Sequence, residues 1–146
     1  MSVDPDVDVH VPAQRRELAR THGGVLAVIA LGGGLGAMAR YGISRWLPTT
    51  PDHFPWGTFL INVLGCFLIG VLMARWGRRP LLRPFLGVGV LGGFTTFSTY
   101  AVETRAMLTP GEVPMAMAYL FGTLAAATLA VLAGVAVTRK LSGDDR

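Results

Sequence analysis

The sequence predicts an all-α integral membrane protein with four transmembrane helices, and its composition and charge distribution support this. Hydrophobic residues make up 51% of the 146 residues and charged residues only 15%, whereas soluble domains average about 25% charged. The charged residues gather at the two ends and in short clusters, which leaves long uncharged stretches. This composition excludes a disordered chain and argues against a water-soluble globule.

Four stretches are long enough, or nearly so, for the roughly 20 residues that a helix needs to cross a bilayer. In order they are 23–39 with a continuation to 47, 56–74, 84–102 with a continuation to 108, and 113–138. Backbone groups in lipid must bond internally, so each stretch is expected to be helical. Trp46, Trp56 and Trp76 fall at span ends, where indole rings prefer to lie. The domain boundaries follow: a mobile N-terminal tail over 1–22, a transmembrane domain over 23–139 and a C-terminal tail over 140–146.

The basic residues predict the orientation of the chain. One side of the membrane would hold ten of them and the other only Arg45 and Arg105. The ten are Arg15, Arg16, Arg20, Arg75, Arg78, Arg79, Arg83, Arg139, Lys140 and Arg146. This bias predicts that both termini are cytoplasmic in a protein of the inner (plasma) membrane. We assign the net charge of +4 to topology and lipid headgroups, and expect no nucleic-acid partner.

The single cysteine, Cys66, excludes an intrachain disulfide and a cysteine metal cluster. The histidines lie outside the spans, so Cys66 has no base for nucleophilic catalysis, and we expect no enzyme activity.

Polar and small residues inside the spans favour a dimer that contains a water-accessible path through the membrane. Four helices alone enclose little aqueous volume. Glycines four residues apart, Gly32 with Gly36 and Gly89 with Gly93, predict close helix packing, within one subunit or between two. Thr58 and Asn62 share one helix face, and so do Tyr119 and Thr123. These groups must pair with each other or line a path, and two matching stripes favour the path.

Two ionisable residues lie inside the spans, where such groups are functional candidates. Arg40 either extends toward the membrane surface or attracts anions to a vestibule. Glu103, with Arg105 nearby, is expected to make a structural hydrogen bond or ion pair.

The segment 92–100, Gly-Gly-Phe-Thr-Thr-Phe-Ser-Thr-Tyr, is poor material for a continuous helix in the middle of a span. It predicts either a kink whose hydroxyls bond back to the helix, or a break whose freed carbonyls coordinate a cation.

With these motifs the chain resembles the Fluc/CrcB fluoride channels, from Val25 to Gly134. The first span carries Gly-Gly-Leu-Gly-Ala-Met-Ala-Arg-Tyr over 33–41, and the second carries Gly-Thr-Phe-Leu-Ile-Asn-Val-Leu-Gly over 57–65. The third carries 92–99, the most specific signature, and the fourth carries Tyr119. The resemblance implies passive, fluoride-selective export that lowers intracellular fluoride, by an antiparallel dimer with two pores along the subunit interface.

The resemblance also implies roles for individual residues. A structural sodium ion, which is not transported, would be held at the dimer centre by backbone carbonyls of Gly92 and Thr95 from each subunit. The fluoride pore would be lined by Thr58, Asn62, Phe97, Tyr100, Tyr119 and Thr123. Arg40 would be a vestibule residue and Glu103 the family's glutamate of the third span.

These residue types suit the chemistry of fluoride. The ion is small and strongly hydrated, so hydroxyl and amide donors must replace its water. An aromatic ring is positive at its edge, so Phe97 presented edge-on contacts an anion without trapping it. Weak, multiple sites favour conduction.

Three departures from the family pattern stand out. Tyr100 replaces a usual phenylalanine, and its hydroxyl would either donate to fluoride or obstruct the pore. Ala127 lacks a hydroxyl expected one turn beyond Thr123. The biased basic residues predict a fixed orientation, so the second subunit is either an identical chain or an oppositely oriented paralogue.

Two other functions compete with the channel. One is a small four-helix, multidrug-type, proton-coupled exporter, which would usually carry a carboxylate in its first span, where this chain has only Arg40. The other is a membrane scaffold in which the polar stripes only pair helices.

Overall fold

The computed structural model describes residues 10–50, 53–76 and 80–143, and within them every regular element is helical. The elements are α1 (Pro12–Trp46), α2 (Trp56–Trp76), the π-helix η1 (Pro84–Leu91), α3 (Gly92–Phe94), α4 (Phe97–Ala106) and α5 (Val113–Leu141). Four stretches are long and apolar enough to cross a membrane: 22–46, 56–75, 84–106 and 113–141. The four predicted spans are therefore confirmed, with ends within a few residues of those expected.

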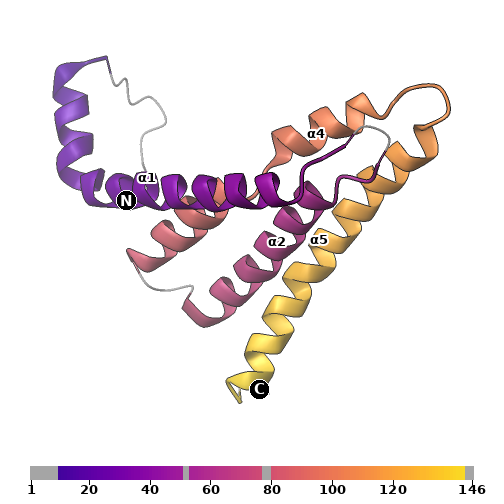
Figure 1. The fold of residues 1–146 in the computed structure, drawn as a ribbon. Coiled ribbons are helices and arrows are strands. Elements are labelled where there is room, and N and C mark those ends of the chain that lie inside the picture. The colour runs from indigo at the N-terminus through magenta and orange to yellow at the C-terminus, as the bar shows by residue number, and fades with distance from the viewer. Residues whose placement is uncertain (1–9, 51–52, 77–79, 144–146) are drawn as a thin grey trace.

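The helices form two closely packed groups (Figure 1). α2 and α5 lie side by side, and their contact is the most extensive in the described chain. α1 crosses over the molecule and packs against η1 and α3, the first half of the third span. The second half of that span, α4, makes far fewer contacts with its neighbours.

Glycines lie where backbones meet most closely. A side chain on Gly70 would strike the carbonyl of Val131, and one on Gly134 would strike the carbonyl of Phe67. Between α1 and the third span, Gly36 faces the Val90 carbonyl and Gly93 faces Gly33. The glycine pairs predicted from four-residue spacing therefore pack within one subunit, since Gly32 and Gly89 also face each other.

The third span is broken, as the sequence predicts. After η1 and the single turn of α3, Thr95 and Thr96 are extended, with ψ of 158° and 120°, before α4 resumes at Phe97. The Thr96 side chain then caps α4 by accepting a hydrogen bond from the backbone of Thr99.

The helix α1 begins well before its apolar part. It starts at Pro12, a residue favoured in the first turn, whereas the membrane-length stretch begins at His22. Residues 12–22 of the expected tail are therefore helical, and Figure 1 shows the first turns of α1 bent away from the rest. Residues 1–9 and 144–146 lie outside the described residues, and the mobility of both tails stays a prediction.

Candidate functional site

The Asn62 side chain bridges the break in the third span. Its Nδ2 donates to the Thr96 carbonyl at 2.9 Å, and its Oδ1 accepts from the Thr96 backbone N–H at 2.9 Å. The amide thus replaces hydrogen bonds that a continuous helix would have made, and it ties α2 to the extended residues. One of its two N–H donors remains for another partner.

The same break frees the carbonyls of Gly92 and Thr95, the two that the family resemblance assigns to a sodium ion. In a helix the Thr96 N–H would bond the Gly92 carbonyl and the Thr99 N–H would bond the Thr95 carbonyl. Both N–H groups are diverted: Thr96 to Asn62, and Thr99 to the Thr96 hydroxyl at 3.1 Å. Carbonyl oxygens are suitable ligands for a hard cation, so the donor set fits this role.

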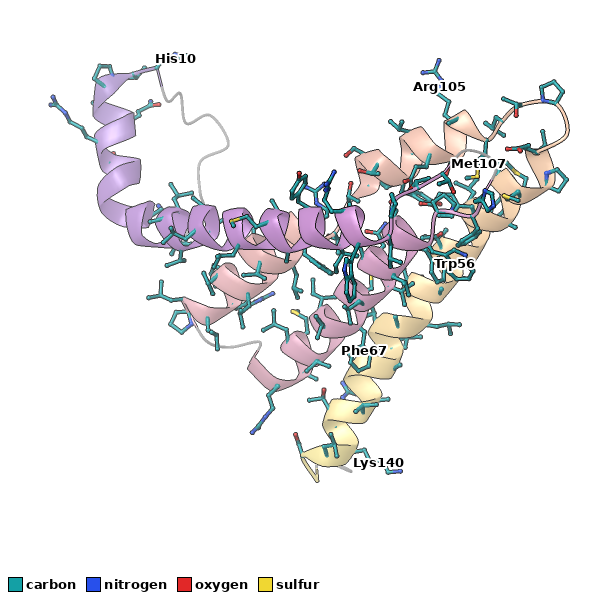
Figure 2. The ribbon with its side chains drawn as sticks, in the orientation of Figure 1. His10, Trp56, Phe67, Arg105, Met107 and Lys140 are labelled. Atoms are coloured by element: carbon teal, nitrogen blue, oxygen red, sulfur yellow. The ribbon has the colours of Figure 1, made fainter. Side chains whose placement is uncertain are left out.

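Glu103 is the centre of a hydrogen-bonded cluster. Its Oε1 accepts from the Thr49 hydroxyl at 2.8 Å and the Thr58 hydroxyl at 3.0 Å, and its Oε2 accepts from the Tyr119 hydroxyl at 2.8 Å. Of the two predicted alternatives, the hydrogen bond is confirmed. Over 80–143, the segment that holds both residues, Arg105 makes no ion pair with Glu103, and Figure 2 shows it pointing away from the helices.

Tyr100 is held by α5. Its hydroxyl donates to the Leu120 carbonyl at 2.6 Å, and its ring lies 5.2 Å from that of Tyr119, centroid to centroid. The hydroxyl that distinguishes this residue from phenylalanine therefore bonds to protein backbone.

Thr123 differs from the other predicted pore residues. It is only 4% exposed, and its hydroxyl is the one buried side-chain polar atom in the described parts of the chain without a hydrogen-bond partner. Leaving a hydroxyl unpaired in an apolar surrounding is unfavourable by about 1–3 kcal/mol. Such a group is suited to a ligand or a water molecule.

A cavity of about 230 Å³ collects these groups on one side of the broken span. It is lined by Asn62, Cys66, Thr95, Thr96, Phe97, Tyr100, Thr123, Leu124 and Ala127. The fold thus brings together Asn62, Phe97, Tyr100 and Thr123 as predicted. Thr58 and Tyr119 lie instead in the Glu103 cluster, beside a second cavity of about 340 Å³ that Glu103 lines.

Two further predicted residues lie at the edges of this arrangement. Phe97 is 80% exposed, and its ring is 5.9 Å from that of Tyr100. Arg40 is half-buried, and its Nε donates to the Gly93 carbonyl at 3.1 Å. This hydrogen bond ties α1 to α3 just before the break, and both interpretations of Arg40 stay predictions.

Comparison with known proteins identifies the family. The family described as CrcB-like protein, Camphor Resistance (CrcB), matches residues 27–135. The chain belongs to this CrcB-like family. The resemblance found in the four motifs is therefore confirmed, and the chain is a multi-pass membrane protein.

Curated members of the CrcB-like family are similar over most of their length. The chain is 54% identical to the fluoride-specific ion channel FluC 2 of Nocardia farcinica over 126 residues, 84% of this chain and 90% of the relative. It is 51% identical to FluC 1 of Streptomyces coelicolor over 138 residues, 91% and 90% of the two chains. It is 40% identical to FluC of Rhizobium meliloti over 121 residues, 80% and 97% of the two.

Three residues of this arrangement were not predicted from the sequence. Thr96 caps α4 and bonds Asn62 on α2. A threonine that follows a Gly-Gly pair and precedes a helical stretch could have indicated this capping role. Thr49 bonds Glu103 from a loop, which no local pattern indicates. Cys66 lines the cavity, and its spacing of four from Asn62 placed it on the same face.

Proposed function

We propose that this chain is a subunit of a fluoride-selective channel that passively exports fluoride from the cytoplasm. The observation that carries the proposal is the cavity beside the broken span, where the Thr123 hydroxyl has no protein partner. The names of the relatives, fluoride-specific ion channels, support the choice of ion.

The hydrogen bonds divide the proposed pore residues into two groups. Thr123 and the remaining N–H of Asn62 are available to an anion in the cavity. Each hydroxyl has a single O–H to donate, and those of Thr58, Tyr119 and Tyr100 are already directed to Glu103 or Leu120. In this proposal Thr58 and Tyr119 reach fluoride only after rotating away from Glu103.

The Phe97 ring lines the cavity, and in this proposal its positive edge contacts the anion. Because a ring edge carries no full charge, it stabilises fluoride weakly, and weak binding permits rapid release. Selectivity then comes from a narrow path in which few donors replace the water around the ion.

A sodium ion bound by the Gly92 and Thr95 carbonyls is part of the proposal. The diversion of the Thr96 and Thr99 N–H groups, which leaves both carbonyls without helical partners, supports it. A fixed cation there would make the surroundings electropositive and disfavour cation passage.

A second, antiparallel subunit would complete the pore. Phe97 and Ser98 are exposed in the middle of a span, beside the freed backbone of Gly92. Irregular backbone at membrane depth requires a covering of protein or a cavity. An identical chain or an oppositely oriented paralogue would supply this covering.

We further propose that the protein lies in the inner membrane with both termini in the cytoplasm. Arg105 and Lys140 lie at opposite ends of the molecule in Figure 2. The ten basic residues on the side of Lys140 against two on the side of Arg105 support the orientation.

The test is fluoride efflux from liposomes that contain the purified chain, measured with a fluoride electrode. We expect fluoride efflux, little chloride efflux and no requirement for a proton gradient. Phe97→Ile should reduce efflux at least tenfold and leave the dimer intact by size-exclusion chromatography. A strict requirement for a proton gradient would support the exporter. Absence of fluoride flux, both for this chain alone and for this chain mixed with an oppositely oriented paralogue, would support a scaffold.

A further inference from the structure

The helices α2 and α5 run in the same direction, so the polar residues spaced four apart on one helix lie opposite those on the other. Each such pair of opposite residues is called a level here. Thr58 and Tyr119 meet at Glu103 near one end, and Gly70 lies against Val131 toward the other. The two stripes continue at four-residue spacing, with Asn62 level with Thr123. At the next level α2 carries Cys66 and α5 carries Ala127.

The third level, Cys66 with Ala127, lines the same cavity as the second level, Asn62 with Thr123. Cys66 and Ala127 line the cavity of about 230 Å³ together with Asn62 and the unpartnered Thr123. Ala127 contributes only a methyl group, so the Cys66 thiol is the polar side chain at this level. The thiol is half-buried and is not in a disulfide.

A thiol is small and largely apolar, and its S–H is a weak hydrogen-bond donor. Beside a path for a small anion, a weak donor continues the row of donors beyond Thr123 without holding the ion.

We propose that Cys66 lines the ion path as its third level and passes a small halide ion to or from Thr123 by donating its S–H. This inference rests on the proposed function, and it names a side chain that sets the ease of passage beyond Thr123. It also makes the path sensitive to thiol chemistry, because Cys66 is the only cysteine in the chain.

The experiment modifies the full-length chain in liposomes with methyl methanethiolsulfonate. The Cys66 sulfur, as thiolate, attacks the sulfenyl sulfur, an S–S bond forms, and methanesulfinate leaves with the electron pair. The added S-methyl group should lower fluoride efflux at least tenfold, and dithiothreitol should restore it. The matched control is Cys66→Ala, whose efflux the reagent should leave unchanged.

A second readout does not depend on flux. Mass spectrometry follows the rate of modification in fluoride and in the same concentration of chloride, with the detergent-unfolded chain as a measure of full reactivity. Fluoride should slow the reaction several-fold and chloride should not. Complete modification with unchanged efflux, equal rates in the two salts, or a thiol that reacts only after unfolding would each overturn the proposal.

Two substitutions of Cys66 separate hydrogen-bond donation by its side chain from the effect of its volume. Cys66→Ser keeps a donor and Cys66→Val keeps apolar volume without one. Efflux should stay within about threefold of the parent chain for Cys66→Ser and fall several-fold further for Cys66→Val. Equal efflux from both would refute S–H donation. If the parent chain conducts no fluoride but fluoride still protects Cys66, the passive-channel proposal fails, whereas halide binding beside Cys66 stands.

Discussion

The two halves of the third span are held in place by different interactions. The first half, η1 with α3, packs on α1 through glycines whose backbones touch. The second half, α4, makes few close contacts, and polar side chains hold it: Asn62 bonds Thr96 where α4 begins, and Glu103 receives hydroxyls from α2 and α5. Close packing therefore fixes the first half, whereas side-chain hydrogen bonds hold the second half in place.

The largest effect should follow from removing the bridge between the two halves. Asn62→Ala leaves the Thr96 N–H and carbonyl without partners, which should lower the free energy of unfolding by about 3 kcal/mol and abolish fluoride efflux. Unfolding in mixed micelles by SDS titration measures the first effect. Thr128→Ala, which removes an exposed hydroxyl bonded to Leu124 of its own helix, should change stability by less than about 0.5 kcal/mol.

The glycine-packed half should reject even one methyl group. Gly36→Ala places a carbon against the Val90 carbonyl, so we expect a loss of about 2 kcal/mol in the same titration. Gly34 has open space around it, and Gly34→Ala should be neutral or stabilising by up to about 1 kcal/mol. Equal effects at the two positions would contradict the close approach of α1 and η1.

The polar half should tolerate change better. Glu103→Gln exchanges one acceptor oxygen for a donor, so either Tyr119 or both Thr49 and Thr58 lose their acceptor, and stability should fall by about 1.5 kcal/mol. Arg105→Gln should have almost no effect, because Arg105 is exposed and lies outside the Glu103 cluster. A larger loss from Arg105→Gln would favour an ion pair.

Apart from the control substitutions, the smallest effect is expected at Tyr100. Tyr100→Phe removes the bond to the Leu120 carbonyl, so stability should fall by about 1 kcal/mol while fluoride efflux stays near that of the parent chain. Efflux reduced more than tenfold would instead make the hydroxyl a donor to the ion.

Much of the fold follows from local properties of the chain. The spans were predictable because the length of an apolar stretch decides whether a helix crosses the bilayer. The break was predictable because Gly92, Gly93 and the hydroxyl residues after them disfavour helix wherever they occur. The four motifs likewise indicated the family before any geometry.

The partners of the side chains were not predictable in the same way. Helical spacing placed Thr58 and Asn62 on one face, and Tyr119 and Thr123 on another. It could not say that Thr58 and Tyr119 both bond Glu103, that Arg40 bonds the Gly93 carbonyl, or that Thr123 keeps a free hydroxyl.

Four membrane spans and the break in the third could be predicted from the sequence alone, because hydrophobic length and backbone propensity act within one segment. Which polar groups bond to one another, and which keep no partner, became clear only from the packing of the helices. That choice depends on how two helices are rotated and aligned against each other, and the glycines that set this contact, such as Gly70 and Gly134, act across the whole fold.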